Sequence, residues 1–294
     1  MDLHDPSLPD AFTHAGGAEA LVALDPDHPG FRDSVYRERR NTIAQIALDH
    51  RTGSPVAHAP YSDDEHHVWA LVHDSLAPLH AARACKEILE LQKVLPLPEA
   101  RVPQLADLNP RLYAVAGFTM EPVAGLVSAR TFLMHLGRRV FLSTQYIRHA
   151  SKPFYTPEPD VIHELVGHAA TLIHPGIAEL NRVVGEAACV ADAPSMARLE
   201  RVYWYTLEFG LVREGSDIKA FGAGLLSSSG ELDRCTRVPT LHGWDLEAMA
   251  ATPYDPTTFQ DVLFVAPSFT RLLCDVTAWV RTGGHRATSP HSTG

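Results

Sequence analysis

Two histidines and three acids occur together in the stretch Tyr155-Thr156-Pro157-Glu158-Pro159-Asp160-Val161-Ile162-His163-Glu164-Leu165-Val166-Gly167-His168. Its apolar residues fall at helical spacing, which predicts a buried helix. Burying imidazoles and carboxylates costs free energy unless they are hydrogen-bonded, paired or bound to a metal. The stretch therefore indicates a metal site, with two hydrogen-bonded core histidines as the alternative.

The two histidines, His163 and His168, are five residues apart. In a straight α-helix, residues four apart differ by about 40° around the axis, whereas residues five apart differ by about 140°. The zinc-protease motif HExxH needs the four-residue spacing, so a zinc hydrolase is only a remote alternative. If both histidines bind one ion, we expect one of them at an irregular helix end or turn, where Gly167 would relieve crowding.

A third ligand is expected from the helix that begins near Pro194. Glu208 lies in its apolar run Tyr203-Trp204-Tyr205-Thr206-Leu207-Glu208-Phe209, with Trp204 one turn earlier on the same face. An acid among aromatic residues is either a tuned carboxylate or a metal ligand, unless it turns outward to solvent. Two histidines and one carboxylate are the ligand set of non-haem iron(II) oxygenases.

Composition limits the class of protein. The 294 residues are 45% hydrophobic and 20% charged, as is typical of soluble globular chains. A formal net charge of −10 argues against a nucleic acid or an anionic membrane as partner. No apolar run approaches the roughly 18 residues that span a bilayer, and no signal peptide is evident. The four cysteines form no CxxC pair, so we expect reduced thiols and a cytoplasmic location.

Apolar periodicity predicts a mainly α fold with a few short β-strands. We expect a single domain over residues 31–281, with an extended or disordered arm at 1–30 and a flexible tail at 282–294. Strands are predicted at 118–121 and 140–145, and a hairpin at 211–221. The predicted helices cover 36–47, 68–76, 79–95, 128–136, 175–184, 194–210, 246–250 and 269–280, with a break at Pro78 and a C-terminal glycine cap at Gly210.

Several long motifs resemble the catalytic domain of the pterin-dependent aromatic amino acid hydroxylases. The longest runs from Thr144 through Tyr155-Thr156-Pro157-Glu158-Pro159-Asp160 into HELVGH, and the resemblance extends from about Val35 to Val280. Further matching segments are Pro122–Leu126, Tyr203–Leu211 and Ile218–Ser228. The resemblance implies that the chain has the fold of this catalytic domain. It also implies an enzyme that uses iron(II), tetrahydrobiopterin or a related reduced pterin, and molecular oxygen.

The resemblance also implies roles for individual residues. His163, His168 and Glu208 match the iron ligands. Arg148 matches the residue that receives the substrate carboxylate, and Asp160 matches the acid that holds this arginine, although an arginine alone is more often a surface ion-pair partner. The remaining matches to the substrate pocket are Tyr155, Thr156, Pro159, Trp204, Phe209, Gly224 and Ser227.

The expected pterin contacts centre on Phe132, which matches the aromatic residue that stacks on the cofactor. Taken alone, Phe132 and Tyr203 would be ordinary core aromatics. In the family's reaction, one oxygen atom goes to the pterin and the other to the aromatic ring. The other residues matching the pterin site are Gly125, Leu126, Val127, Ala129, Glu164 and Tyr203.

Departures from the family pattern bear on specificity. Family members often carry serine at the position of Ala129, Val-Pro at 169–170 and an aromatic residue at Ser229. Trp204 favours the types that act on phenylalanine or tyrosine over the tryptophan type. Pro256 stands where tyrosine-acting members carry an acid, although Asp255 is adjacent.

The favoured reaction is hydroxylation of L-phenylalanine to L-tyrosine. The alternatives are a phenylalanine 3-hydroxylase that forms meta-tyrosine and a tryptophan hydroxylase. A non-catalytic binding protein is disfavoured because all three ligand positions are filled. The family's regulatory domain and tetramerisation helix have no counterpart in the sequence, so we expect a monomer or weak dimer whose small-molecule partner is the amino acid.

Overall fold

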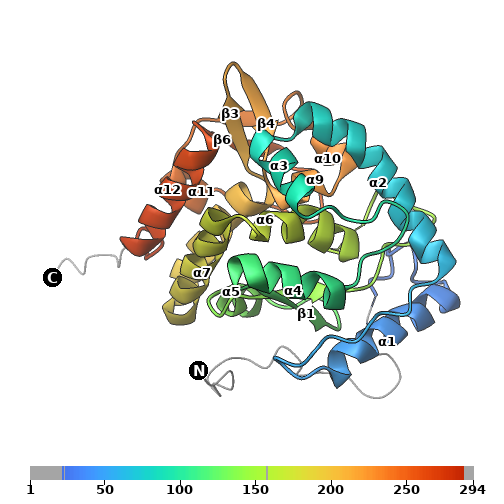
Figure 1. The fold of residues 1–294 in the computed structure, drawn as a ribbon. Helices are drawn as coiled ribbons and strands as arrows, with labels where there is room; N and C mark the ends of the chain where they lie inside the picture. Colours follow the sequence, from blue (N-terminus) through green and yellow to red (C-terminus); the bar gives the residue numbers. More distant parts are fainter. Residues whose placement is uncertain (1–21, 23, 157, 288–294) are drawn as a thin grey trace.

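The structure, a computed structural model, describes residues 22, 24–156 and 158–287. Most of this region is helical, as predicted, with two segments of π-helix among the α-helices (Figure 1). The α-helices are α1 Ser34–Asp49, α2 Asp63–Arg83, α3 Lys86–Val94, α4 Leu105–Ala116, α5 Ala129–Leu136, α6 Ala170–Leu172, α7 Pro175–Val190, α8 Ala193–Tyr203, α9 Ala223–Leu226, α10 Ser229–Arg234, α11 Leu246–Ala251 and α12 Phe269–Arg281. The π-helices are η1 His163–Ala169 and η2 Trp204–Glu208.

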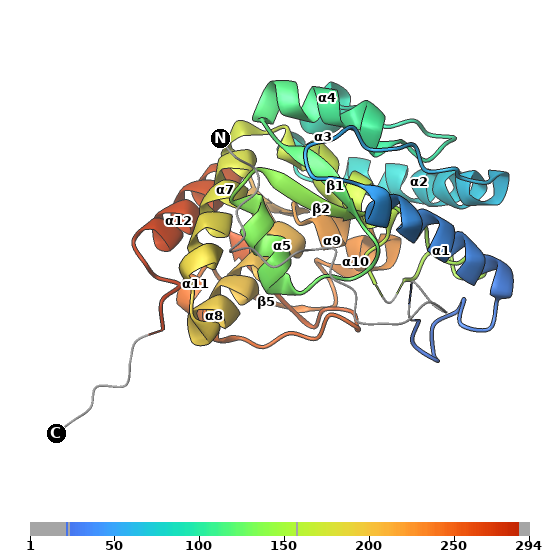
Figure 2. The same ribbon diagram turned by 90° about the horizontal axis from the view of Figure 1, so that it is seen from below.

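Short strands form two small sheets. In the first, β1 (Thr119–Val123) pairs in parallel with β2 (Val140–Thr144), and the pair lies between α4 and α5 (Figure 2). The second has the order β4-β3-β6-β5. Its strands are β3 Leu211–Glu214, β4 Asp217–Ala220, β5 Thr240–His242 and β6 Val262–Ala266. The predicted hairpin is therefore confirmed as β3–β4, with Gly215 in its turn at a φ of 62°.

Most of the predicted arm and part of the predicted tail lie outside the described residues, so the three-part division of the chain stays a prediction. Within the described part, one large core joins the two sheets and most helices, with Trp69, Phe118, Phe141 and Phe264 fully buried. Helix α5 begins where the sequence predicts it, and the Ser128 side chain caps it by accepting a hydrogen bond from the Thr131 amide.

The predicted helix break at Pro78 is wrong. Helix α2 runs through Pro78 to Arg83. Its buried face continues on both sides of the proline, through Leu76 and His80, and His80 Nε2 bonds to the Leu226 carbonyl at 2.7 Å. This packing offsets the backbone hydrogen bond that a proline removes. The chain instead breaks at Cys85, whose amide donates to the Ala220 carbonyl of β4 at 3.0 Å.

The predicted glycine cap at Gly210 is confirmed in position. Helical structure ends at Glu208, Phe209 is the C-cap, and Gly210 follows as the C′ residue, where its amide donates to the Thr206 carbonyl at 2.9 Å. Gly210 does not, however, have the positive φ that is common at this position. A glycine is nevertheless required there, because a Cβ would overlap the Thr206 carbonyl oxygen. The backbone of Gly210 also accepts hydrogen bonds from the amides of Phe221 and Gly222, both at 3.0 Å.

Helices α5 and α7 meet at two glycines. A Cβ on Gly185 would overlap the backbone of Gly137, and a Cβ on Gly137 would come within 2.9 Å of the Glu186 amide nitrogen. The two backbones therefore approach more closely than any side chain permits. This contact brings α7 against α5, the helix that follows the loop beside β1.

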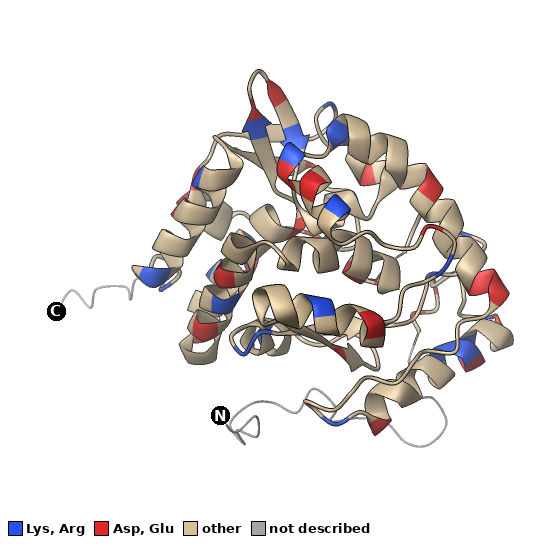
Figure 3. Cartoon of the chain, in the orientation of Figure 1, with Lys and Arg blue, Asp and Glu red and all other residues tan. Residues whose placement is uncertain are grey.

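Acidic and basic residues are interspersed on the outer helices in the view of Figure 3. On α7, for example, Arg182 pairs with Glu179 at 2.7 Å and also with Glu186. Among the described residues, no helix combines the length and apolarity that crossing a membrane would require.

Candidate functional site

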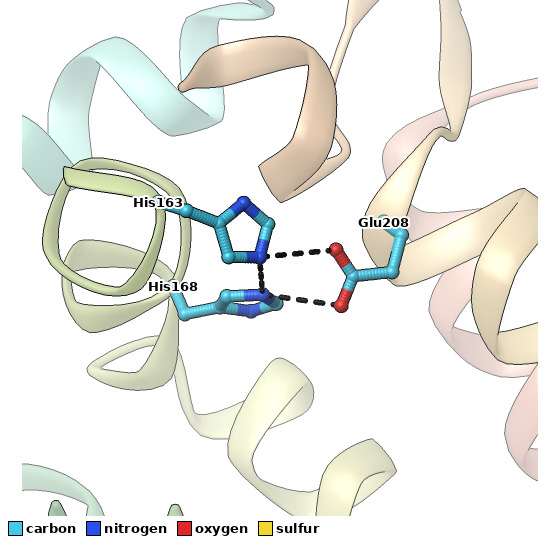
Figure 4. Close-up of side chains that lie close together, drawn as sticks. All are labelled: His163, His168 and Glu208. Atoms are coloured by element: carbon cyan, nitrogen blue, oxygen red, sulfur yellow. Dashed lines mark hydrogen bonds and ion pairs between the residues drawn. The ribbon is translucent and has the colours of Figure 1, made fainter. Parts of the chain in front are cut away.

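The five-residue spacing of His163 and His168 is resolved by helix type. Residues His163–Ala169 form the π-helix η1, in which backbone bonds run from i to i+5. Residues five apart therefore lie on one face, and both imidazoles project from it (Figure 4). The expectation of an irregular helix end or turn is confirmed in its second form, because the irregularity is a wider π-helical turn inside a continuous helix. A Cβ at Gly167 would come within 2.8 Å of the Ala223 carbonyl oxygen, so glycine lets η1 pack on α9.

Glu208 is presented by a second π-helix, η2 (Trp204–Glu208), which continues α8. The Phe209 amide donates to the Trp204 carbonyl at 2.8 Å, an i to i+5 bond. In both segments that carry candidate ligands, the backbone hydrogen bonds therefore span five residues instead of the four of an α-helix. The two segments face each other across the site (Figure 4).

The three side chains converge on one point (Figure 4). His163 Nε2 and His168 Nε2 are 3.2 Å apart. The Glu208 carboxylate approaches them at 3.5 Å and 3.1 Å, respectively. Among the described residues, these three form the group whose ligand atoms all lie within 4.8 Å of one another and can hold a metal ion.

Ser227 fixes the tautomer of His163. The Ser227 hydroxyl donates to the Ala223 carbonyl at 2.8 Å, so toward His163 Nδ1, 3.0 Å away, it acts as an acceptor. His163 therefore carries its proton on Nδ1 and presents the Nε2 lone pair to the centre. An unprotonated imidazole nitrogen held by a partner on its other nitrogen is the usual form of a metal-binding histidine.

Burial and mutual charge set the protonation of this group. Burial lowers the pKa of His163 to about 4, which keeps the ring neutral at pH 7. Burial opposes the charged form of His168 too, but the facing Glu208 outweighs it and raises that pKa. Burial likewise opposes ionisation of Glu208, yet His168 and His163 hold its pKa below the ordinary value. A neutral imidazole beside an ionised carboxylate is a donor set that fits a divalent iron ion.

Arg148 and Asp160 form a buried bidentate pair. The Arg148 Nε and Nη2 atoms each donate to one Asp160 oxygen at 2.8 Å, and the Arg148 amide adds a third bond at 2.8 Å. Burial would raise the pKa of Asp160, but the guanidinium outweighs it and holds the pKa below its ordinary value. Arg148 is 4% exposed and Asp160 is fully buried. The pair is thus rigid and neutral overall. Arg148 Nη1 also donates to the Pro153 carbonyl at 3.4 Å, and the guanidinium hydrogens that are not directed at these two partners can bind an anion.

One cavity of about 840 Å³ joins these groups. Every residue that the sequence placed in the metal, substrate or pterin site lines it, except Asp160, which lies behind Arg148. The aromatic wall is close-packed, with the Trp204 and Phe209 rings 4.6 Å apart between centroids. On the other side, Phe132 makes edge contacts with Phe141 and Tyr203 at 5.2 Å and 5.9 Å.

Glu164, expected near the pterin, is buried and lines the same cavity. Its carboxylate accepts from the Thr144 hydroxyl at 3.2 Å and from the Thr144 amide at 3.4 Å. Burial raises the pKa of Glu164 to about 8, so the group is mostly protonated at neutral pH and can donate a hydrogen bond into the cavity.

Sequence reasoning missed several residues of the wall. The ring of Tyr254 stacks on Trp204 at 4.1 Å with an interplanar angle of 10°, although only its loop was singled out. The contact joins residues 50 apart in the chain, and no local pattern signals it. The other cavity residues without a sequence-based prediction include Thr144, Phe154, Glu158, Glu200, Ser228, Glu231 and Phe259.

Comparisons with known proteins agree with this geometry. Residues 13–286 match the family model of biopterin-dependent aromatic amino acid hydroxylases. The chain is 45% identical to human tyrosine 3-monooxygenase over 251 residues, 84% of this chain and 48% of that protein. It is also 45% identical to rat phenylalanine-4-hydroxylase over 251 residues, 84% of this chain and 55% of that one. The chain spans about half the length of these curated relatives.

The fold is similar to a crystal structure of Chromobacterium violaceum phenylalanine hydroxylase with bound iron(III) and the oxidised cofactor 7,8-dihydrobiopterin. The TM-score is 0.74 at 30% identity, covering 92% of this chain and 98% of that chain. Together with the match to the family model, this likeness confirms the predicted mainly α fold. The chain belongs to the biopterin-dependent aromatic amino acid hydroxylase family.

Proposed function

We propose that this protein is an iron- and pterin-dependent monooxygenase that hydroxylates L-phenylalanine to L-tyrosine. The observation that carries the proposal is the cavity in which a two-histidine, one-carboxylate group and a buried arginine–aspartate pair occur together. The first fits a metal that keeps open coordination positions. The second fits the carboxylate of a free amino acid.

Each part of the cavity then has a role. His163, His168 and Glu208 would hold the iron, which together with the pterin supplies oxygen activation. Arg148, held by Asp160, receives the substrate carboxylate. Trp204, Phe209 and Pro159 enclose the aromatic ring and exclude water from it, while the wall around Phe132 receives the flat pterin. Holding both reactants in one cavity replaces a chance encounter with a fixed geometry.

Phenylalanine is favoured over tyrosine by the loop at 254–258. Pro256 lines the cavity at the position where tyrosine-acting relatives carry an acid. The neighbouring Asp255 is exposed, and its carboxylate accepts from the Thr257 amide and hydroxyl at 2.8 Å and 2.6 Å. Asp255 does not line the cavity, so its carboxylate does not face a substrate phenol. This wall suits an unsubstituted ring.

Hydroxylation of tyrosine is a second candidate, because the chain is equally identical, at 45%, to a tyrosine 3-monooxygenase and to a phenylalanine-4-hydroxylase. The test is to incubate the purified protein with iron(II), a reduced pterin and oxygen, and with phenylalanine, tyrosine or tryptophan in turn. Chromatography of the products should give para-tyrosine from phenylalanine at the highest kcat/KM. Exclusive meta-tyrosine, or a preference for tyrosine or tryptophan, would contradict the proposal.

A further inference from the structure

One wall of the cavity is an exposed loop that ends at a buried glutamine. Tyr254 and residues 256–259 line the cavity, and residues 255–259 are all exposed. Gln260, which closes the loop, is only 5% exposed. Loop 253–259 therefore depends on a few contacts for its position. Its start is held by the Tyr205 hydroxyl, which donates to the Pro253 carbonyl at 2.8 Å, and its middle is held by Gln260.

The side-chain amide of Gln260 uses both of its donor hydrogens and accepts one hydrogen bond within this wall. Its Nε2 donates to the carbonyls of Asp255 and Thr258, both at 2.9 Å. Its Oε1 accepts from Trp204 Nε1 at 2.9 Å. The same amide thus ties the loop at two points and fixes the indole on which Tyr254 stacks.

The backbone of Gln260 is held independently from α10. Its amide donates to Glu231 Oε1 at 2.7 Å, and its carbonyl accepts from Arg234 Nη1 at 2.9 Å. The Arg234 guanidinium also lies 5.1 Å from the centroid of the Phe259 ring. A side-chain substitution at Gln260 leaves these backbone bonds in place, so it releases the loop and the indole without detaching the residue.

We propose that Gln260 is a positioning residue that sets the Trp204–Tyr254 stack and loop 253–259 as the wall that receives the substrate ring. The inference rests on the proposed function for its substrate. Only glutamine supplies two donors and one acceptor at this reach, because asparagine is one methylene shorter, glutamate lacks the donors and methionine lacks all three.

Two variants separate the contacts. Gln260→Glu keeps an acceptor for Trp204 and loses both bonds to the loop, whereas Gln260→Met loses all three. In both variants, amide hydrogen exchange in 254–259 should accelerate about tenfold. In metal-free, ¹⁵N-labelled protein, the Trp204 indole resonance, assigned by its loss in Trp204→Phe, should shift in Gln260→Met and stay close to its wild-type position in Gln260→Glu.

Kinetics give a second test. The KM for phenylalanine should rise about tenfold in both variants, while the KM for the pterin, which faces the opposite wall, should change by less than about twofold. The control is Gln45→Glu, the same change on the exposed face of α1, which should match wild type in every measurement. Thermal unfolding shows whether each variant is folded.

The outcomes are distinguishable. Wild-type exchange rates and an unshifted indole in folded Gln260→Met would overturn the positioning role. An equal rise in both KM values would do the same, because it would indicate general damage. If wild-type protein hydroxylates no aromatic amino acid, the proposed function fails, and exchange and the indole resonance still decide whether Gln260 positions the wall.

Discussion

At the scale of single residues, the candidate metal site consists of three side chains from two π-helical segments, His163 and His168 from η1 and Glu208 from η2. Two histidines and an acid in apolar runs indicated a metal group, and the structure brings these side chains together. The proton on His163 Nδ1 depends on Ser227, 64 residues away. The stacking of Tyr254 on Trp204 depends on a similar long-range contact. Such details follow from the fold and cannot be read from local spacing.

Replacing Glu208 tests the ligand assignment. In Glu208→Ala we expect iron affinity to fall by about 100-fold or more, since even changes behind a ligand cost 10–100-fold. Hydroxylation should be lost in parallel. Metal content after dialysis and product formation measure the two effects. Glu186→Gln, on the exposed face of α7, serves as the control, and iron retention in Glu208→Ala would refute the assignment.

At the scale of elements, patterning predicted most helices of the described region but not their type. A π-helix has the same apolar residues as an α-helix, and only the five-residue spacing of His163 and His168 indicated an anomaly. Helix α4 was missed because Pro103 and Pro110 interrupt its pattern. Strand β6 was missed because a short apolar run fits a strand or a buried helix equally well.

Removing one residue from η1 tests whether the wider turn is needed. Deleting Val166 leaves the histidines four apart, where an α-helix places them about 40° apart around its axis, so the wider turn is removed while Asp160 keeps nearly the same facing. We expect the variant to bind iron more weakly, because the two Nε2 atoms no longer converge on Glu208 as they do on the π-helix, and to keep the Arg148–Asp160 pair. The matched control is Val166→Ala, which should lose roughly 1–2 kcal/mol of stability and keep its iron. Calorimetric titration with iron(II) compares them, and unchanged binding after the deletion would contradict the prediction.

At the scale of the whole molecule, the sequence predicted a mainly α fold but not how its strands assemble. The order β4-β3-β6-β5 joins strands separated by up to 50 residues or so, with α9, α10 and α11 between them. Parallel pairing over such distances is set by the packing of intervening helices. The resemblance to a known family conveyed this topology where periodicity did not.

The stability of the fold in acid tests one long-range contact, that of Glu121 with His50 and the Gly53 amide. Burial would raise the pKa of Glu121 in β1, but His50 and the Gly53 amide outweigh it and hold the pKa below 4.5, its ordinary value. Its ionised form therefore stabilises the fold above about pH 4.5, and this contribution is lost as pH falls through the lower folded-state pKa. Glu121→Gln should unfold roughly 1–2 kcal/mol more easily at pH 7, and the difference should shrink toward pH 3.5.

Urea unfolding at several pH values measures this difference. The exposed Glu38→Gln on α1 should stay within about 0.5 kcal/mol of wild type. A constant gap between Glu121→Gln and wild type across the whole pH range would contradict the linkage.

The contact of Gly137 with Gly185 has a consequence for how this sequence can change over time. Each glycine is opposed by the backbone of the other helix, and backbone cannot be trimmed by a second substitution. A larger residue at either position therefore has no compensating partner, unlike a pair of side chains that exchange volume. The two positions should therefore tolerate no substitution, singly or together. The apolar residues around them can change in size when a neighbouring side chain changes by a compensating volume.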